Sequence, residues 1–172
     1  MRIALTTVCC LVLCSLPTLA QKTKAAMSDQ KFLDLAAQTD MIEANLGDLA
    51  QDAAASQAVK DYGRMVAGDH SQDYQKLQSL AQQTGLTLPT AIDSAHNKSL
   101  ISPLHALKGK AFDHKYIEDM VAGHTDAIAT YKKEAQDATN PAIRAYAQAT
   151  LPALEKHLDH AKAIEQGKTS SM

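Results

Sequence analysis

The chain has 172 residues and a formal net charge of −2, with 17 Lys and Arg against 19 Asp and Glu. This length suffices for one domain with a hydrophobic core. The mildly acidic balance argues against nucleic acid as a partner, because nucleic acid requires a basic face. The absence of Trp and the presence of only two Phe leave little aromatic surface on which bases or sugars would stack.

The first 20 residues have the layout of a secretory signal peptide. Arg2 supplies a positive start, residues 3–16 carry no charge, and small residues precede an expected cleavage between Ala20 and Gln21. The apolar run is shorter than the roughly 20 residues that span a bilayer. No later segment is apolar enough, so we expect no transmembrane segment in the mature chain. These features predict a periplasmic or secreted protein.

All three cysteines, Cys9, Cys10 and Cys14, lie within this leader. A lipoprotein would be acylated at Cys14, but the large Leu13 before it disfavours that alternative. The mature protein is therefore expected to form no disulfide and no thiolate metal site. Any metal must be held by imidazole, carboxylate or backbone oxygen.

Apolar residues at steps of three and four predict two long helices in the first half of the chain. After a flexible tail over residues 21–28, the first helix spans about 29–54, with Ser28 or Asp29 as its N-cap. The second spans about 57–84 with Ser56 as N-cap, and Gly85 is suited to the left-handed C-cap position. The short break predicts that these helices pack antiparallel.

Residues 86–110 are less regular and form a long connection. Here Ser94 is expected to cap a short helix that bends near Pro103 and ends at Gly109. A third helix is predicted over about 110–137 and a fourth from Pro141 to about 165, followed by a flexible tail over 166–172. Pro152 either kinks the fourth helix or follows a fresh N-cap. The whole pattern predicts an all-α, up-and-down four-helix bundle over residues 29–165.

One polar residue interrupts the apolar stripe of each long helix: Glu43, His70, His124 and His157. Each should point into the bundle or to its edge. At 1.5 Å per residue, Glu43, His70 and His124 fall near mid-bundle if neighbouring helices are antiparallel. His157 falls within a turn of that level.

Four polar groups at one level of a core need partners, because an uncompensated buried polar group costs about 1–3 kcal/mol. One divalent transition metal (Zn, Fe, Cu, Ni or Mn) would satisfy all four, and bundles build such sites from facing helices. The alternative is a hydrogen-bond network in which Glu43 pairs with one histidine and the others bond to backbone or tyrosine. Asp69 and Asp73 flank His70, and one of them is a candidate to orient its ring. The favoured alternative is that both are solvated or pair with Lys76. His160 follows His157 by three residues, but its charged neighbours favour exposure.

Several segments in order resemble a bacterial family of exported proteins of unknown function, the DUF4142 type. They cover nearly all of residues 30–164 and include 32–37, 43–47, 64–66, 69–70, 111–113, His124, 151–152 and 157–158. The resemblance implies a ferritin-like four-helix bundle and an envelope location but no activity. The Glu-x-x-His motif of di-iron bundles is absent, which argues against a ferroxidase and favours a single metal ion.

The sequence thus leads to three functional hypotheses. The first is an exported bundle that binds one divalent transition metal through Glu43, His70, His124 and His157, for storage, buffering or stress tolerance. The second is a non-catalytic envelope protein in which these residues form a structural network. The third is a metal-free hydrolase with His and Glu as acid and base. Protein partners and any reaction are left open.

Overall fold

The computed structural model describes residues 27–168. The expected signal peptide and its cleavage point, together with most of the two expected tails, lie outside these residues. The helices are α1 (Asp29–Ala53), α2 (Gln57–Thr84), α3 (Ser94–His96), a π-helical turn η1 (Asn97–Ile101), α4 (Ser102–His105), α5 (Gly109–Asp137) and α6 (Pro141–Glu165). The prediction of an all-α protein with four long helices is confirmed.

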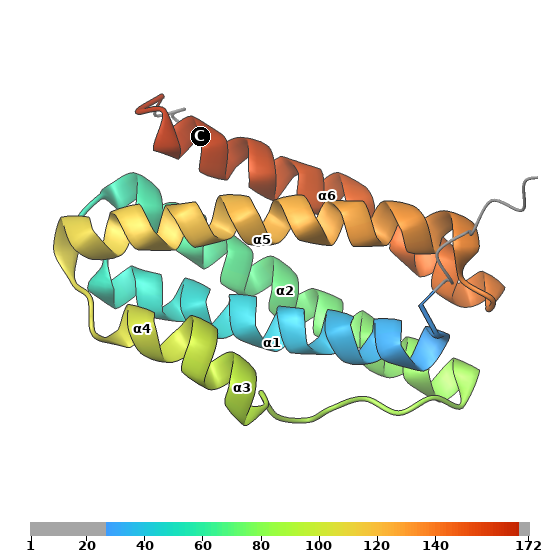
Figure 1. The fold of residues 1–172 in the computed structure, drawn as a ribbon. Coiled ribbons are helices and arrows are strands. Elements are labelled where there is room, and N and C mark those ends of the chain that lie inside the picture. The colour runs from blue at the N-terminus through green and yellow to red at the C-terminus, as the bar shows by residue number, and fades with distance from the viewer. Residues whose placement is uncertain (1–26, 169–172) are drawn as a thin grey trace, which may run out of the picture.

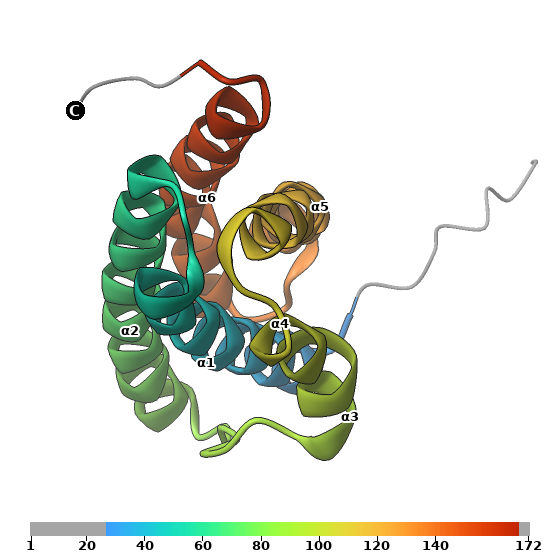
Figure 2. The ribbon, with the colours of Figure 1, turned by 90° about the vertical axis from the view of Figure 1, so that its left-hand side faces the viewer.

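The four long helices form two antiparallel hairpins, α1 with α2 and α5 with α6, that pack side by side (Figures 1 and 2). The connection from α2 to α5 runs back along the whole bundle, so α5 has the same direction as α2 (Figure 1). Contacts between the hairpins are made by α2 with α6 and by α1 with α5, and both pairs are antiparallel. One long crossover between two hairpins is the ferritin-like arrangement.

Local capping sets the helix ends. The Ser28 side chain accepts a hydrogen bond from the N–H of Lys31 at the start of α1, and Asn140 caps α6 in the same way, with Pro141 at the first helical position. Gly85 ends α2 with φ +69°, a left-handed conformation that glycine adopts without strain. Ser56 precedes α2 as predicted, but its side chain makes no capping bond.

Two aspartates tie the hairpin loops to the opposite hairpin. Asp113 of α5 accepts hydrogen bonds from the backbone N–H groups of Ala55 and Ser56 in the α1–α2 loop. Asp29 of α1 accepts from the N–H groups of Thr139 and Asn140 in the α5–α6 loop. These bonds satisfy loop backbone groups and fix the ends of the two hairpins relative to each other.

The long connection differs from the prediction in three respects. Asp93, rather than Ser94, caps the short helix, because its carboxylate accepts from the N–H of His96. Gly109, with φ +64°, does not end this segment but begins α5. The helix also passes through the π-helical turn η1 just before Pro103 instead of bending as one α-helix.

Polar side chains hold this connection against the bundle. Gln38 of α1 donates to the carbonyl of Ala91 at 2.9 Å and accepts from the N–H of Asp93 at 3.1 Å. The Tyr74 hydroxyl of α2 donates to the carbonyl of Pro89 at 2.8 Å. The extended part of the crossover therefore has its backbone groups satisfied by the first hairpin, and α3 to α4 lie outside α1 and α5 (Figure 2).

Two local features shape the long helices. The fourth helix is continuous through Pro152, so no fresh helix begins there.

In the first hairpin, Gly47 and Gly63 face each other: a Cβ at Gly47 would lie 2.5 Å from the carbonyl oxygen of Gly63. The absence of side chains at both positions allows α1 and α2 to approach closely.

The hydrophobic core is divided into two clusters. One includes Leu46, Tyr62 and Phe112, and the other includes Phe32 and Leu77. Between them lies a layer of buried polar side chains contributed by all four long helices: Asp40, Glu43, His70, Asp73, His124 and His157. Within residues 27–168, no helix is both long and apolar enough to cross a membrane.

Candidate metal centre

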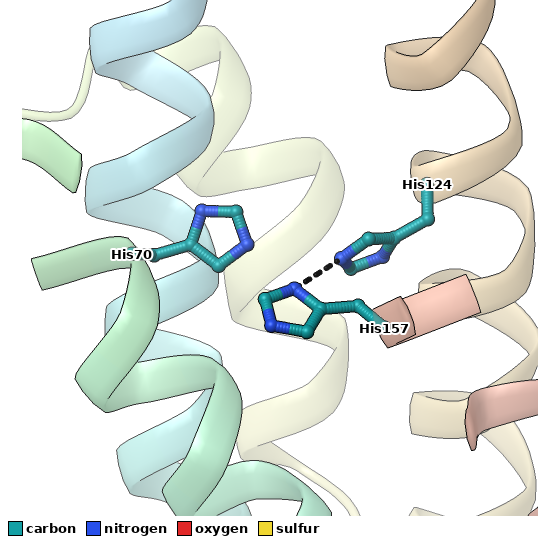
Figure 3. A group of neighbouring side chains, drawn as sticks. All are labelled: His70, His124 and His157. Carbon is teal, nitrogen blue, oxygen red and sulfur yellow. Dashed lines mark hydrogen bonds between the residues drawn. The ribbon is translucent and has the colours of Figure 1, made fainter. Parts of the chain in front are cut away.

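Three of the four sequence-predicted site residues meet in the polar layer. His70 comes from α2, His124 from α5 and His157 from α6, and one ring nitrogen of each lies within 4.8 Å of the other two (Figure 3). The three residues are almost fully buried, with 4%, 1% and 1% of their whole-residue surface exposed. The first hairpin thus contributes one imidazole and the second contributes two.

The ring of His70 is oriented by α1. Its Nδ1 lies 2.8 Å from Oδ1 of Asp40, which is itself 2% exposed. A carboxylate only accepts hydrogen bonds, so Nδ1 carries the hydrogen and donates it to Asp40. The second nitrogen, Nε2, is buried and has no hydrogen-bond partner among the described residues. In neutral His70 this Nε2 holds a lone pair.

The ring of His124 is oriented by its own helix. Its Nδ1 lies 2.9 Å from the carbonyl oxygen of Met120, one turn earlier in α5. A carbonyl oxygen also only accepts, so Nδ1 again carries the hydrogen. The Nε2 of neutral His124 therefore has a lone pair as well, and it faces the other two histidines (Figure 3).

The ring of His157 is oriented across the α2–α6 interface. Its Nε2 lies 2.8 Å from Oδ2 of Asp69, a residue of α2 whose side chain is 48% exposed. By the same argument Nε2 donates to the carboxylate, which leaves the lone pair on Nδ1. That Nδ1 lies 3.3 Å from Nε2 of His124.

Each imidazole thus donates outward to an oxygen and turns a lone pair inward. This is the usual arrangement of metal-ligating histidines, in which a carboxylate or carbonyl fixes the tautomer of each ligand. Two nitrogens that bind one ion at 2.0–2.1 Å in tetrahedral geometry lie about 3.3 Å apart, which matches the spacing between His124 and His157. The donor set suits an ion, and the nitrogen of His70, which lies within 4.8 Å of the other two, would have to approach them to complete a three-nitrogen site.

Burial and neighbouring charges separate the pKa values of the three rings. Burial, together with the positive charge that His70 and His157 can carry, lowers the pKa of His124 to about 3. Burial also lowers the pKa of His157, against the opposing effect of Asp69. Burial opposes the charged form of His70 too, but the hydrogen bond to Asp40 and the charge of Glu43 outweigh it and raise its pKa. A single proton in this group therefore prefers His70.

Glu43, the fourth predicted ligand, does not join the group of three. It is buried beside it, on the side of α5 where a Cβ at Gly123 would lie 3.5 Å from the glutamate Oε1. Its Oε2 is without a hydrogen-bond partner among the described residues. Burial raises the pKa of Glu43 to about 7, against the opposing effect of His70. Glu43 could act as a fourth ligand only after its side chain rearranges.

Asp40, the hydrogen-bond partner of His70, was not predicted from the sequence, which pointed to Glu43 as a metal ligand or as the partner of one histidine. The signal was present, since Asp40 precedes Glu43 by three residues and follows the buried Phe32 and Ala36 at helical spacing. The expectation that Asp69 or Asp73 would orient His70 is not what the structure shows. Asp69 instead orients His157.

Asp73 and the remaining histidines lie outside the group. Asp73 accepts from Lys76 at 3.1 Å, in line with the favoured alternative for this residue, and it also accepts from the Tyr146 hydroxyl. His160 packs edge-on against Tyr62, with ring centroids 5.3 Å apart, and it is half-buried rather than exposed. Nδ1 of His96 lies 2.6 Å from Oδ2 of Asp93, the residue that caps the same short helix. His105 and His114 are exposed.

A family model described as "Domain of unknown function (DUF4142)" matches residues 14–164. The chain belongs to the DUF4142 family. This confirms the resemblance seen in the sequence, and the match includes the three clustered histidines. No match was found among curated proteins.

Two solved structures share the fold of this DUF4142 chain. CopM in its Cu(II)-bound form has a TM-score of 0.69 and 15% sequence identity, over 84% of this chain and 100% of CopM. CopM in its Ag-bound form has a TM-score of 0.66 at the same identity, over 84% of this chain and 99% of the other. At this identity the likeness establishes a common helical fold.

Proposed function

We propose that this protein binds one divalent transition-metal ion through Nε2 of His70, Nε2 of His124 and Nδ1 of His157. The observation that carries the proposal is the convergence of three lone pairs, each fixed by an oxygen acceptor on the far side of its ring. An ion at their centre would replace the unfavourable contact between facing lone pairs with coordinate bonds.

The donor set narrows the choice of metal. Three imidazoles favour Cu(II), Ni(II) or Zn(II) over Mn(II). The affinity of a nitrogen site for divalent metals rises from Mn(II) through Fe(II), Co(II) and Ni(II) to Cu(II), and is lower again for Zn(II). The neighbour of known structure, CopM, is described in Cu(II)-bound and Ag-bound forms, which supports copper as the first metal to test. Three protein ligands leave one coordination position for water, for Glu43 after a side-chain rearrangement, or for an exogenous ligand.

The proposed setting is outside the cytoplasm, since the leader at residues 1–20 has the composition of a signal peptide. A buried, single-ion site fits storage, buffering or protection against excess metal. These roles need a single ion and therefore do not require the carboxylate-rich donor set of a di-iron centre. No reaction is assigned to the site.

The second candidate is a structural hydrogen-bond network without metal. One observation favours it: the raised pKa of His70 means that a proton on its Nε2 can serve the lone pairs of His124 and His157. A protonated His70 would then satisfy the layer in place of an ion. The two candidates differ in what the purified protein contains.

The test is elemental analysis and calorimetric titration of untagged mature protein with Cu²⁺ and Zn²⁺. We expect about one ion per chain for wild type and loss of binding in His70→Ala and His124→Ala. His160→Ala is the matched control, because His160 lies on α6 outside the group, and it should bind as wild type does. Absence of binding by wild type would refute the metal site and leave the proton-linked network.

A further inference from the structure

The histidine group is buried, so an ion needs a path to it. A cavity of about 190 Å³ lies between α2 and α6, and its lining includes Asp69, His70 and His157. This volume accommodates several water molecules, since one water requires roughly 10–15 Å³ of such space. The cavity therefore brings solvent to the outer side of two of the three histidines.

A second cavity, of about 400 Å³, lies between α1, α5 and the long connection. Glu43 and Gly123 line it together with Leu35, but none of the three histidines does. An ion that entered there would reach the carboxylate of Glu43 before any imidazole. Direct access to the rings is thus offered by the α2–α6 cavity and not by this one.

At the α2–α6 cavity, Asp69 occupies the boundary between water and the buried rings. Its side chain is 48% exposed, whereas that of its partner His157 is 2% exposed. The other carboxylate in the lining, Asp73, is engaged by Lys76 and by Tyr146. Among the described residues, Asp69 is bonded only through Oδ2, to the ring of His157, whose other nitrogen is directed at His124.

We propose that the α2–α6 cavity is the access route of the metal ion. Asp69 lies at the inner end of this cavity and receives the ion before His157 does. This inference rests on the proposed metal site and adds the path and a positioning residue. Lys76 and Lys156 line the cavity together with Asp69 and Asp73, so the attraction for a cation is local to the carboxylate of Asp69, which speeds association at that point. The hydrogen bond from His157 to Asp69 then re-forms behind the ion and holds the ring in its binding tautomer.

A route and a ligand are distinguished by kinetics. A side chain that obstructs the route slows association and dissociation by the same factor and leaves the dissociation constant unchanged, because it contacts neither end state. A residue that only orients a ligand changes affinity, chiefly through the dissociation rate. The two roles therefore predict different changes in measured rates.

The experiment is stopped-flow mixing of the mature protein with Co²⁺, followed by visible absorption, and chelator-driven release of the bound ion. Ala153→Phe places a ring in the α2–α6 cavity at an exposed position of α6. Ala145→Phe is its matched control, exposed on the same helix but outside the cavity lining. Leu35→Trp fills the α1–α5 cavity instead. Thermal melting checks that each variant is folded.

We expect Ala153→Phe to slow binding and release equally, and Ala145→Phe and Leu35→Trp to leave both rates unchanged. Asp69→Asn keeps an oxygen acceptor for His157 but removes the charge, so association should slow by about tenfold or more. Asp159→Asn, an exposed carboxylate of α6 outside the cavity, should have no effect.

Wild-type association rates in Ala153→Phe and Asp69→Asn, or slow association in Leu35→Trp, would overturn the route while leaving the metal site intact. An Asp69→Asn variant whose loss of affinity comes entirely from faster dissociation would show that Asp69 only orients His157, and would also overturn it. If wild type takes up no ion at all, both the route and the proposed function fail, and the absence of stoichiometric metal identifies that case.

Discussion

Nε2 of His124 lies 3.3 Å from Nδ1 of His157, and the opposite nitrogen of each ring donates to an oxygen, that of Met120 or Asp69. When both rings are neutral, neither of the two facing nitrogens carries a hydrogen. The contact is then between two lone pairs in a low-dielectric layer, where such a polar contact is costly. A cation relieves this contact, and that cation is either a metal ion or a proton.

Metal should hold the two hairpins together. His70 belongs to the α1–α2 hairpin, and the other two histidines belong to the α5–α6 hairpin. At a free Zn²⁺ concentration of about 100 times the dissociation constant, binding stabilises the folded state by about 2.7 kcal/mol. This corresponds to a rise in Tm of roughly 5–10 °C, measurable by circular dichroism.

In the His124→Ala variant the same Zn²⁺ addition should leave Tm unchanged relative to the variant's own metal-free value. Loss of the buried imidazole changes the metal-free Tm of the variant by itself, so only the metal-dependent difference is compared. An equal rise in the variant and in wild type would mean that Zn²⁺ acts elsewhere on the protein.

Protons should compete with metal mainly at His70. Its pKa is raised, whereas that of His157 is lowered and that of His124 is about 3. Because the pKa of His70 is raised above the ordinary histidine value of 6.5, a proton already occupies its Nε2 at pH 6.5 and must leave before metal binds. The logarithm of the apparent affinity should therefore fall as pH falls, with a slope closer to one per pH unit than to three.

Calorimetric titration with Zn²⁺ at a series of pH values between 5 and 7 measures this slope. The same series in two buffers of different ionisation enthalpy gives the number of protons released. Burial also raises the pKa of Asp40 to about 6 and that of Glu43 to about 7, so the count is repeated with Glu43→Gln at pH 6.5, where Asp40 is mostly ionised. Release of nearly three protons by that variant would show that all three rings are protonated before metal binds, contrary to the assigned pKa order.

Asp40 should control the affinity of the site although it does not contact the ion. Asp40→Asn replaces the charged acceptor of the His70 Nδ1–H with a neutral one, which makes Nε2 a weaker ligand. We expect a 10- to 100-fold loss of metal affinity, measured by competition with a chelator. Asp48→Asn, an exposed position on the same helix, provides the control, and an equal loss in both variants would exclude a specific role for Asp40.

Glu43 should destabilise the metal-free protein at neutral and alkaline pH. Its folded pKa is raised from 4.5 to about 7, so the folded state holds a proton more tightly than the unfolded state does. The free energy of unfolding then falls as pH rises from 4.5 through 7. Glu43→Gln removes this penalty and should stabilise the protein by about 1–3 kcal/mol at pH 8.

Urea denaturation of wild type and Glu43→Gln at pH 4 and pH 8 tests this sign. The difference in stability between the two proteins should shrink toward zero at pH 4, where both side chains are neutral. A stabilisation that is the same at both pH values would indicate a packing effect rather than a buried charge.

The close approach of α1 and α2 should make Gly47 intolerant of any side chain. Gly47→Ala places a Cβ 2.5 Å from the carbonyl oxygen of Gly63, a backbone atom that cannot move alone. We expect destabilisation of about 1–3 kcal/mol. Gly68→Ala, also within a helix but with nothing within 4 Å of its Cβ, should stabilise by about 0.5–1 kcal/mol. Opposite signs in urea denaturation confirm the close contact.

The positions of the long helices could be predicted because the signals that set them are local. Ser28, Gly85 and Pro141 act on the backbone within a turn of their own positions, and the spacing of apolar residues marks each buried face. Where local signals compete, as between Asp93 and Ser94 or at Gly109, the predicted boundaries of the short helix were wrong. The connection is held by distant partners such as Gln38, which no local pattern reveals.

The sequence by itself determined that one helix after another would carry a polar residue on its buried face, and that three imidazoles would share a level. Only the tertiary structure decided which carboxylate faces which ring. Asp40 bonds to His70 and Asp69 bonds to His157, whereas Glu43 is hydrogen-bonded to none of the three rings. The physical reason is that helical periodicity tells which face of its own helix a side chain occupies, but not which group of a neighbouring helix it meets. Hydrogen-bond partners are chosen by the rotation and separation of packed helices, and these depend on contacts such as that of Gly47 with Gly63, which join distant parts of the chain.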